Sequence, residues 1–394
     1  MTGEYLSLVV TAQCNLRCSY CYQSAKNPRR AEWNVLQAGI DLAWGGGLSQ
    51  IEIMFLGGEP LLEFDLIRRA VSYSETLDPG RNRFRFALST NGTLISEGVA
   101  DYLDEHEFDI QLSFDGVQQA QGYRGSGTFE ILNSVLDSLS VKHPQLFRNR
   151  LRISMTVIPV TFSLLAESVK FLLEKGVRRI QINPCLTPYS GWEKDRINKL
   201  DDEFARVAEI SLNHLQHTGM VPVTLLRKRD NEVTREGRRF RMCNALNGDA
   251  LVMDLDGQLY TCTLLVESYQ KFPPGSLMEQ VPALKLGDVR DPKVRMRCAA
   301  LAESAGVANL LPSLRGSCSS CGNCDECEYS GQCNVCPVSI WQVSSAAGPY
   351  RVPDFVCAFN KVTLKYRERF PSILEAYRRF FPESDVANTT RDGR

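Results

Sequence analysis

Short apolar runs alternate with longer amphipathic stretches over the first half of the chain. The runs are rich in β-branched and aromatic residues and predict six strands, at residues 6–11, 51–55, 84–88, 109–114, 151–157 and 179–183. Between them, apolar residues recur every three or four positions and predict helices over residues 62–76, 128–139 and 162–174, the last of which is closed by Gly176. This alternation predicts an α/β fold, a partial (β/α)6 barrel similar to an incomplete TIM barrel. We expect functional side chains at the carboxyl ends of its strands.

The pattern changes beyond the sixth strand. We assign residues 1–217 to the barrel, 218–242 to a polar and basic bridge, 243–360 to a cysteine-rich domain, and 361–394 to a C-terminal helix and polar tail. The helix is predicted over residues 361–381, and the tail from 384. We interpret the basic runs of the bridge, such as Arg227-Lys228-Arg229, as a solvated linker, with a site for anions or acidic peptides as the alternative.

Charge and composition exclude several classes of partner. Lysine and arginine total 45 against 46 for aspartate and glutamate, so a net charge of -1 offers no field that would attract nucleic acid or a membrane surface. No stretch resembles a secretory signal or reaches the length of a membrane span, and we expect a cytoplasmic protein. The 14 cysteines cluster at gaps of two and three residues, a spacing typical of metal ligation in a cytosolic chain.

Three cysteines, Cys14, Cys18 and Cys21, lie just after the first strand. A loop with this spacing can place three thiolates around one face of a four-iron cluster and leave one iron open to another ligand. The same spacing fits a zinc site that takes a fourth ligand from elsewhere in the chain. The residues alone leave both interpretations open.

The spacing C-x3-C-x2-C, with aromatic Tyr20 before the third cysteine, resembles the signature of the radical S-adenosylmethionine (SAM) superfamily. The resemblance implies that the open iron binds the amino and carboxylate groups of SAM and cleaves the cofactor reductively to a 5'-deoxyadenosyl radical. The second strand ends in Gly57-Gly58-Glu59-Pro60, which is similar to the "GGEP" motif of that family. We expect backbone carbonyls and Glu59 to accept hydrogen bonds from the methionyl ammonium group of SAM.

Further polar residues close the later strands, and by the same resemblance they would contact SAM or the substrate. Each fits an ordinary cap or turn equally well. They are Ser89, Asn91, Ser113, Asp115, Arg124 and Asn183.

The C-terminal cysteines resemble a SPASM domain, an extension of radical SAM enzymes that holds two auxiliary iron–sulfur clusters. By that resemblance the inner cluster would be held by Cys243, Cys262 and Cys336, and the outer one by Cys324, Cys327, Cys333 and Cys357. Two features depart from the family pattern. The gap between Cys333 and Cys336 is two residues instead of three, and no second cysteine lies between Cys243 and Gly257. The inner cluster is left with an open iron or with a fourth thiolate from Cys298, Cys318 or Cys321. The extra pair, Cys318 and Cys321, also permits a shifted ligand set or a small zinc site.

Together these motifs predict a radical SAM maturase that oxidatively modifies a ribosomally made peptide, for example by a carbon–carbon or thioether cross-link, and that is reduced by a donor such as flavodoxin or ferredoxin. An anaerobic sulfatase-maturing enzyme, which forms formylglycine, is the nearest alternative. In that subgroup an aspartate proposed as the general base follows the cysteine at the position of Cys262, whereas this chain has Thr263. A radical dehydrogenase of a small alcohol and a zinc-stabilised binding scaffold are the remaining alternatives.

Overall fold

The computed structural model describes most of the barrel and parts of the C-terminal region. The described residues are 5–23, 26–185, 194–228, 250–269, 284–303, 318–319, 322–323, 326–329, 332–333, 336, 352 and 354–372. The strands are β1 (Tyr5–Thr11), β2 (Ile51–Gly57), β3 (Phe84–Thr90), β4 (Asp109–Ser113), β5 (Leu151–Val157), β6 (Ile180–Pro184), β7 (Ala250–Met253), β8 (Gln258–Tyr260), β9 (Lys285–Asp288), β10 (Cys318–Ser319) and β11 (Gly322–Asn323).

The α-helices lie between and after these strands. They are α1 (Trp33–Trp44), α2 (Phe64–Leu77), α3 (Glu97–Glu105), α4 (Gln118–Gln121), α5 (Thr128–Lys142), α6 (Leu165–Glu174), α7 (Lys194–Thr218), α10 (Val294–Glu303) and α12 (Asp354–Arg367). Short 3-10 or π turns are η1 (Pro60–Glu63), η2 (Leu146–Arg150), η3 (Phe162–Leu164), η4 (Thr224–Leu226) and η5 (Thr263–Leu265).

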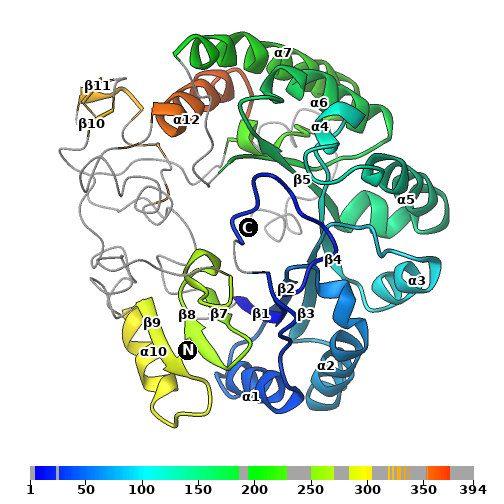
Figure 1. Ribbon diagram of the computed structural model, residues 1–394, viewed down its shortest axis with the longest axis vertical. Helices are drawn as coiled ribbons and strands as arrows, with labels where there is room; N and C mark the ends of the chain where they lie inside the picture. The colour runs from blue at the N-terminus through cyan, green and yellow to red at the C-terminus, as the bar shows by residue number, and fades with distance from the viewer. Residues whose placement is uncertain are drawn as a thin grey trace, which may run out of the picture.

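One sheet organises the molecule, with the strand order β6-β5-β4-β3-β2-β1-β7-β8-β9. The first six strands are parallel, and α1 to α7 cover the outside of the sheet (Figure 1). All six predicted strands are confirmed, with ends shifted by at most two residues, and Gly176 ends α6 with a φ of +84° as its position predicts. The carboxyl ends of these parallel strands therefore meet at one edge of the sheet, where the predicted site residues lie.

The core lies between the sheet and the helices. Alternate residues of β2, Ile51, Ile53 and Phe55, are completely buried, as the two-residue period of a strand requires for its packed face. Phe55, Phe86 and Phe108 stack on one another with ring centroids 5.6 to 6.4 Å apart. This apolar layer leaves the other face of the strands free for polar side chains.

The C-terminal region extends the same sheet. Strand β7 pairs in parallel with β1, with Tyr5 opposite Ala250 and Leu8 opposite Met253, and β8 returns antiparallel to it. The hairpin turns at Gly257, whose φ of +90° favours glycine. Its pairing with β1 was not predicted, because a parallel pairing between segments far apart in sequence leaves no local pattern.

Helix α12 packs alongside α7 (Figure 1). The rings of Phe204 and Phe359 meet edge to face at 5.3 Å, and Lys365 Nζ lies 2.7 Å from an Asp201 carboxylate oxygen. This helix begins at Asp354, and the predicted start at residue 361 was wrong because the segment before it was assigned to metal ligation, although a ligand such as Cys357 can equally lie on a helix. The helix ends at Arg367 and residues 368–372 are not helical, so the prediction of an unbroken helix over 361–381 was wrong, because Pro371 cannot continue it. The polar tail lies outside the described residues.

Among the helices that the structure describes, we find no segment both long and apolar enough to cross a bilayer.

Because β1 holds the barrel strands and the hairpin together, its buried side chains are central to stability. Leu8 is completely buried between β2 and β7, and Leu8→Ala is expected to lower the free energy of unfolding by about 2–5 kcal/mol through lost burial and a residual cavity. Denaturant titration under anaerobic conditions measures this. The matched change Val141→Ala, at a residue 79% exposed on α5, is expected to stay within about 0.5 kcal/mol of the parent. Equal effects of both changes would contradict the central place of β1.

Candidate active site

The three N-terminal cysteines lie on the loop between β1 and α1. This loop crosses the carboxyl edge of the parallel sheet and lies inside the ring of helices (Figure 1). Its two ends are tied together where Ala12 N donates to Arg29 O at 2.9 Å and Ala31 N donates to Val10 O at 2.9 Å. All three thiols are half-buried, so the loop presents them at the edge of the sheet instead of burying them in the core.

The glycines at the end of β2 let this loop approach closely. A Cβ on Gly58 would lie 2.2 Å from the carbonyl oxygen of Gln13, and one on Gly57 would lie 2.7 Å from that of Thr11. At the same place Gly58 N donates to Thr11 O at 2.9 Å, and Glu59 N donates to Gln13 O at 2.8 Å. Only glycine permits this backbone contact. Gly57 and Gly58 therefore fix the start of the cysteine loop, the segment between β1 and α1 that carries the three cysteines.

The Glu59 carboxylate points into the protein. It is completely buried and accepts hydrogen bonds from Thr90 Oγ1 at 2.6 Å, Asn91 N at 2.7 Å and Leu61 N at 3.1 Å. Burial raises the pKa of this carboxyl group to about 7 in spite of these donors. Its oxygens bind the chain itself and hold the ends of β2 and β3 together, and the expected contact between Glu59 and an ammonium group stays a prediction.

The first cysteine is tied to β3 through amide side chains. Asn91 Nδ2 donates to Asn15 Oδ1 at 2.8 Å and lies 4.0 Å from Cys14 Sγ. Asn15 in turn donates to Thr93 Oγ1 at 2.8 Å, and the backbone N–H of Leu16 donates to Cys14 Sγ at 3.4 Å. Asn91 was predicted to contact the cofactor, and in the structure its amide group positions the cysteine loop.

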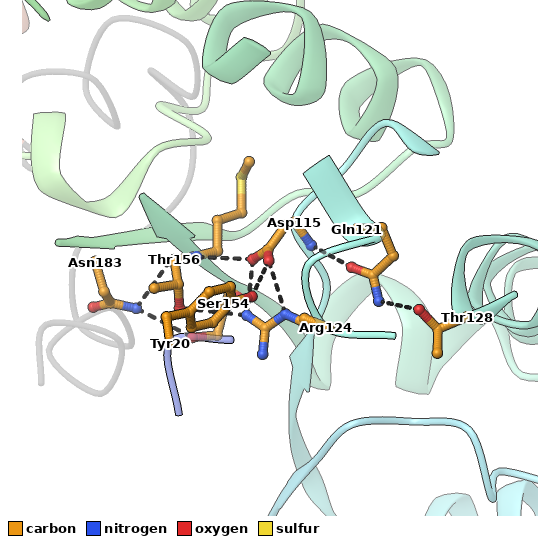
Figure 2. Close-up of polar contacts among 9 residues, drawn as sticks. Tyr20, Asp115, Gln121, Arg124, Thr128, Ser154, Thr156 and Asn183 are labelled. Atoms are coloured by element: carbon orange, nitrogen blue, oxygen red, sulfur yellow. Dashed lines mark hydrogen bonds and ion pairs between the residues drawn. The ribbon is translucent and has the colours of Figure 1, made fainter. Parts of the chain in front are cut away.

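The other side of the loop is held by Asp115 and Arg124 (Figure 2). Arg124 Nε and Nη2 donate to the two oxygens of Asp115 at 3.0 and 2.8 Å, and both side chains are more than nine-tenths buried. The Tyr20 hydroxyl donates to the same carboxylate, and Ser19 N donates to Tyr123 O at 3.0 Å. The pKa of Tyr20 is raised, mainly by burial, so its hydroxyl remains a donor.

Residues that the sequence did not single out complete this network. Thr156 N donates to Asp115 Oδ1 at 2.9 Å, Asp115 N donates to Gln121 Oε1 at 2.9 Å, and Gln121 Nε2 donates to Thr128 Oγ1 at 3.0 Å (Figure 2). No local motif marks Gln121 or Thr156, because each acts only through the position of Asp115.

The fifth and sixth strands join the same network. Arg124 Nη2 donates to the Ser154 carbonyl at 3.2 Å, and Asn183 Nδ2 donates to Ser154 Oγ at 3.1 Å (Figure 2). Asn183 is thus brought beside the Asp115–Arg124 pair, as its place at the end of β6 predicts.

The remaining predicted residues lie at the same edge with fewer contacts. Ser89 and Ser113 are half-buried near the ends of β3 and β4, and Ser89 Oγ accepts a hydrogen bond of 3.4 Å from Gln111 Nε2. Pro60 is buried and begins η1 directly after Glu59. Their contacts with a cofactor stay predictions.

The three sulfurs lie near one another, since Cys21 acts on the pKa of both Cys14 and Cys18. Burial raises the pKa of Cys14 and of Cys18, the neighbouring cysteines raise it further, and Lys26 and Arg124 lower it. Within the part of the chain that the structure describes, no three His, Cys, Asp or Glu side chains converge on a single metal ion. A four-iron cluster does not require such convergence, because each thiolate binds a different iron.

Cys185 is buried with Tyr20 and Ile158, next to Cys18.

The described C-terminal cysteines fall into two groups. Cys262 and Cys336 pack against the main core, and Cys262 Sγ accepts a 3.4 Å hydrogen bond from Leu264 N, as Cys14 does from Leu16. Cys333 and Cys357 pack together against Val352, which brings two predicted ligands of the outer cluster to one place.

The other predicted ligands are placed less completely. Cys327 is half-buried, Cys298 is buried on α10 with its pKa raised to about 11 by burial, and Cys318 lies in β10. Cys243, Cys321 and Cys324 lie outside the described residues.

Comparisons with known proteins decide the family. The Radical SAM superfamily model matches residues 8–137, which include the cysteine loop, Glu59 and the Asp115–Arg124 pair. An uncharacterized protein of Methanocaldococcus jannaschii is 30% identical over 271 residues, which are 66% of this chain and 85% of that protein. The chain belongs to the radical SAM superfamily.

Other relatives narrow the type of radical SAM enzyme. A cysteine-type anaerobic sulfatase-maturating enzyme of Clostridium novyi is 25% identical over 195 residues, covering 45% of this chain and 50% of its own. Two solved structures share the fold: anSMEcpe with bound AdoMet and Kp18Cys peptide (TM-score 0.67, 17% identity, 93% of this chain and 97% of that one) and Streptococcus suis SuiB bound to precursor peptide SuiA (TM-score 0.56, 16% identity, 90% and 75%). This radical SAM enzyme is thus of the type that includes sulfatase maturases and peptide modifiers.

The donor set fits the cofactors of the superfamily, a [4Fe–4S] cluster and SAM. Three half-buried thiols on one anchored loop suit a cluster with one open iron, and the cysteine-rich C-terminal region suits auxiliary clusters. The zinc-stabilised scaffold that the spacing alone left open is set aside by the family assignment.

The close contact between Gly58 and the cysteine loop can be tested by substitution. Gly58→Ala is expected to displace the cysteine loop and to lower the iron bound per chain after anaerobic reconstitution several-fold, because its Cβ would overlap backbone atoms of Gln13. Gly98→Ala is the matched control, since a Cβ there meets nothing within 4 Å. Full iron loading of Gly58→Ala would show that the close contact does not position the loop.

The raised pKa of Glu59 predicts how the stability of the enzyme depends on pH. Its raised pKa means that the folded enzyme holds a proton between pH 4.5 and about 7 that the unfolded chain has lost. Protonation of Glu59 therefore stabilises the folded enzyme. This stabilisation is complete below pH 4.5 and is lost as the pH rises through about 7, which lowers the free energy of unfolding by roughly 3 kcal/mol. The melting temperature of the parent relative to Glu59→Gln should therefore fall between pH 5 and pH 8. Parallel profiles would mean that Glu59 is ionised throughout.

Proposed function

We propose that this enzyme oxidatively modifies a ribosomally made peptide and forms a carbon–carbon or thioether cross-link. The observation that carries the proposal is the cysteine loop locked onto the carboxyl edge of β2 to β5 in a chain that shares the fold of anSMEcpe and SuiB, both solved with a peptide. The peptide in the SuiB complex is its precursor SuiA, so a precursor peptide is the substrate class that the comparison supports.

Cys14, Cys18 and Cys21 hold the cluster to which SAM binds in this proposal. Bound there, cluster and cofactor supply reductive cleavage of the sulfonium and a 5'-deoxyadenosyl radical that removes a hydrogen atom from the substrate. The chain's contribution is to keep the loop rigid. Asn91 holds the segment next to Cys14 against β3, and Tyr20, between Cys18 and Cys21, is held by Asp115.

Arg124 has the position to bind a carboxylate of the cofactor. Its Nε and Nη2 are engaged by Asp115, and Nη2 also reaches Ser154 O, whereas no described residue accepts a hydrogen bond from Nη1. In Figure 2 that nitrogen points away from Asp115. A guanidinium group fixed on two sides offers its third to an anion without losing further side-chain freedom.

The C-terminal cysteines complete the electron balance. Forming the cross-link removes two hydrogens from the peptide: one leaves as an atom to the radical, and the other leaves as a proton and an electron. We assign Cys243, Cys262 and Cys336 to an inner auxiliary cluster that would accept this electron, and Cys324, Cys327, Cys333 and Cys357 to an outer one that would pass it to an external acceptor such as an oxidised ferredoxin. The packing of Cys333 with Cys357 supports the second set. A flavodoxin or ferredoxin is the proposed external donor.

Formylglycine formation in a sulfatase is the second candidate function. The Clostridium novyi relative, a sulfatase-maturating enzyme, favours it. Against it, Thr263 occupies the place where an aspartate is expected in that subgroup, and it begins η5 directly after Cys262. The aldehyde product of this alternative reacts with a hydrazide probe, which a cross-linked peptide does not.

The test is co-expression with a candidate precursor peptide, followed by mass analysis. We expect the loss of two hydrogen atoms per modification and no hydrazide adduct. Combined replacement of Cys14, Cys18 and Cys21 by alanine should abolish both the mass change and the release of 5'-deoxyadenosine. Cys185→Ala, at a cysteine that packs without a proposed ligand role, should keep its iron. A hydrazide-reactive product supports the sulfatase alternative, and product formation by the triple variant refutes the cluster assignment.

A further inference from the structure

The side chain of Tyr269 ends in a buried hydroxyl group for which no described residue is a hydrogen-bond partner. The residue is 1% exposed and follows η5, in the segment that leads away from Cys262. Its ring meets that of Tyr22 edge to face, with centroids 6.0 Å apart. Buried polar groups are nearly always paired in native proteins, so a hydroxyl in this state indicates an acceptor beyond the described residues, such as a group bound to the protein.

The surroundings of Tyr269 show what kind of partner fits. Burial raises the pKa of Tyr269 well above the usual value, and Tyr22, Asp254 and Cys21 raise it further. The hydroxyl therefore keeps its proton and can donate a hydrogen bond. Asp254 does not serve: its oxygens accept from Leu255 N at 2.7 Å and Ser268 N at 3.0 Å, and the Tyr269 hydroxyl makes no hydrogen bond to either of them. Tyr22 makes no hydrogen bond to this hydroxyl either. The neighbour that remains is the sulfur of Cys21, the residue directly before Tyr22, whose ring packs on that of Tyr269.

The backbone around Tyr269 is fixed, which makes the position of its hydroxyl part of the fold. Ser268 N donates to Asp254 in the turn between β7 and β8, and Tyr269 N donates to Val266 O at 3.2 Å. On the other side, Tyr22 directly follows Cys21 in the cysteine loop and packs on the Tyr269 ring. The segment after Cys262 is therefore held against the loop that carries Cys14, Cys18 and Cys21.

We propose that Tyr269 is a positioning residue that donates a hydrogen bond to a sulfur of the N-terminal cluster, either the Cys21 thiolate or an adjoining sulfide, and so raises the reduction potential of that cluster. The reduced cluster carries one more negative charge than the oxidised one, so a donor stabilises it more. Hydrogen bonds to the sulfurs are among the factors that set such potentials. The inference rests on the cluster site of the proposed function and does not depend on the identity of the substrate.

The test is the midpoint potential of the SAM-binding cluster in Tyr269→Phe, which keeps the ring and removes only the hydroxyl. In an anaerobic redox titration followed by electron paramagnetic resonance, this cluster is recognised as the one whose signal changes when SAM is added. We expect the equilibrium to shift about tenfold toward the oxidised cluster, a fall of about 59 mV for a one-electron couple. Iron content should stay unchanged.

Tyr260→Phe is the matched control. Tyr260 is an equally buried tyrosine on β8, but carboxylates, Glu267, Asp254 and Asp256, surround it instead of thiols. Its removal should leave the potential of the SAM-binding cluster unchanged. An unchanged potential in Tyr269→Phe, or the same shift in both variants, would overturn the proposal and make the hydroxyl a purely structural feature.

Should Tyr269→Phe lose iron or fail to fold, 3,5-difluorotyrosine at position 269 decides the question. It keeps the hydroxyl and strengthens it as a donor, so the potential should rise, and an unchanged potential refutes the hydrogen bond. A parent enzyme that binds no cluster at all would refute the proposed function itself, which separates the two failures.

Discussion

The close approach between the end of β2 and the start of the cysteine loop is the constraint on which the site depends. Two backbones meet there without a side chain between them, and Gly58 N and Glu59 N bond directly to carbonyls of Thr11 and Gln13. The loop is long, and without this contact its entropy would oppose any fixed arrangement of three thiols. Because the contact is made by backbone atoms, it fixes the position of Cys14 relative to the end of β2.

Two buried polar networks extend that constraint across the sheet. Glu59 joins β2 to β3, and Asp115 with Arg124 joins β4 to β5 and to Tyr20 of the loop. A buried ion pair contributes little net stability but is strongly destabilising when one partner is removed, by about 3–5 kcal/mol. Such pairs therefore specify one arrangement of the strand ends more than they strengthen the fold.

The C-terminal region is continuous with the barrel sheet. Strand β7 lies directly against β1, and the segment after β8 returns to the cysteine loop, where Tyr269 meets Tyr22. A sheet transmits position well, because its strands are spaced by hydrogen bonds of nearly constant length. The region that holds Cys262 is for this reason placed relative to the loop that holds Cys21 by the fold itself.

The sequence alone determined the six parallel strands, the cysteine loop and the family motif, because each depends on residues close together in the chain. Local periodicity and spacing carry that information directly. Only the tertiary structure decided that Glu59 and Asn91 face the protein, that Gln121 and Thr156 support Asp115, and that β7 pairs with β1. Those facts depend on which distant segments become neighbours, and a side chain with several possible partners, such as a carboxylate, acquires its role only when the fold has excluded the others.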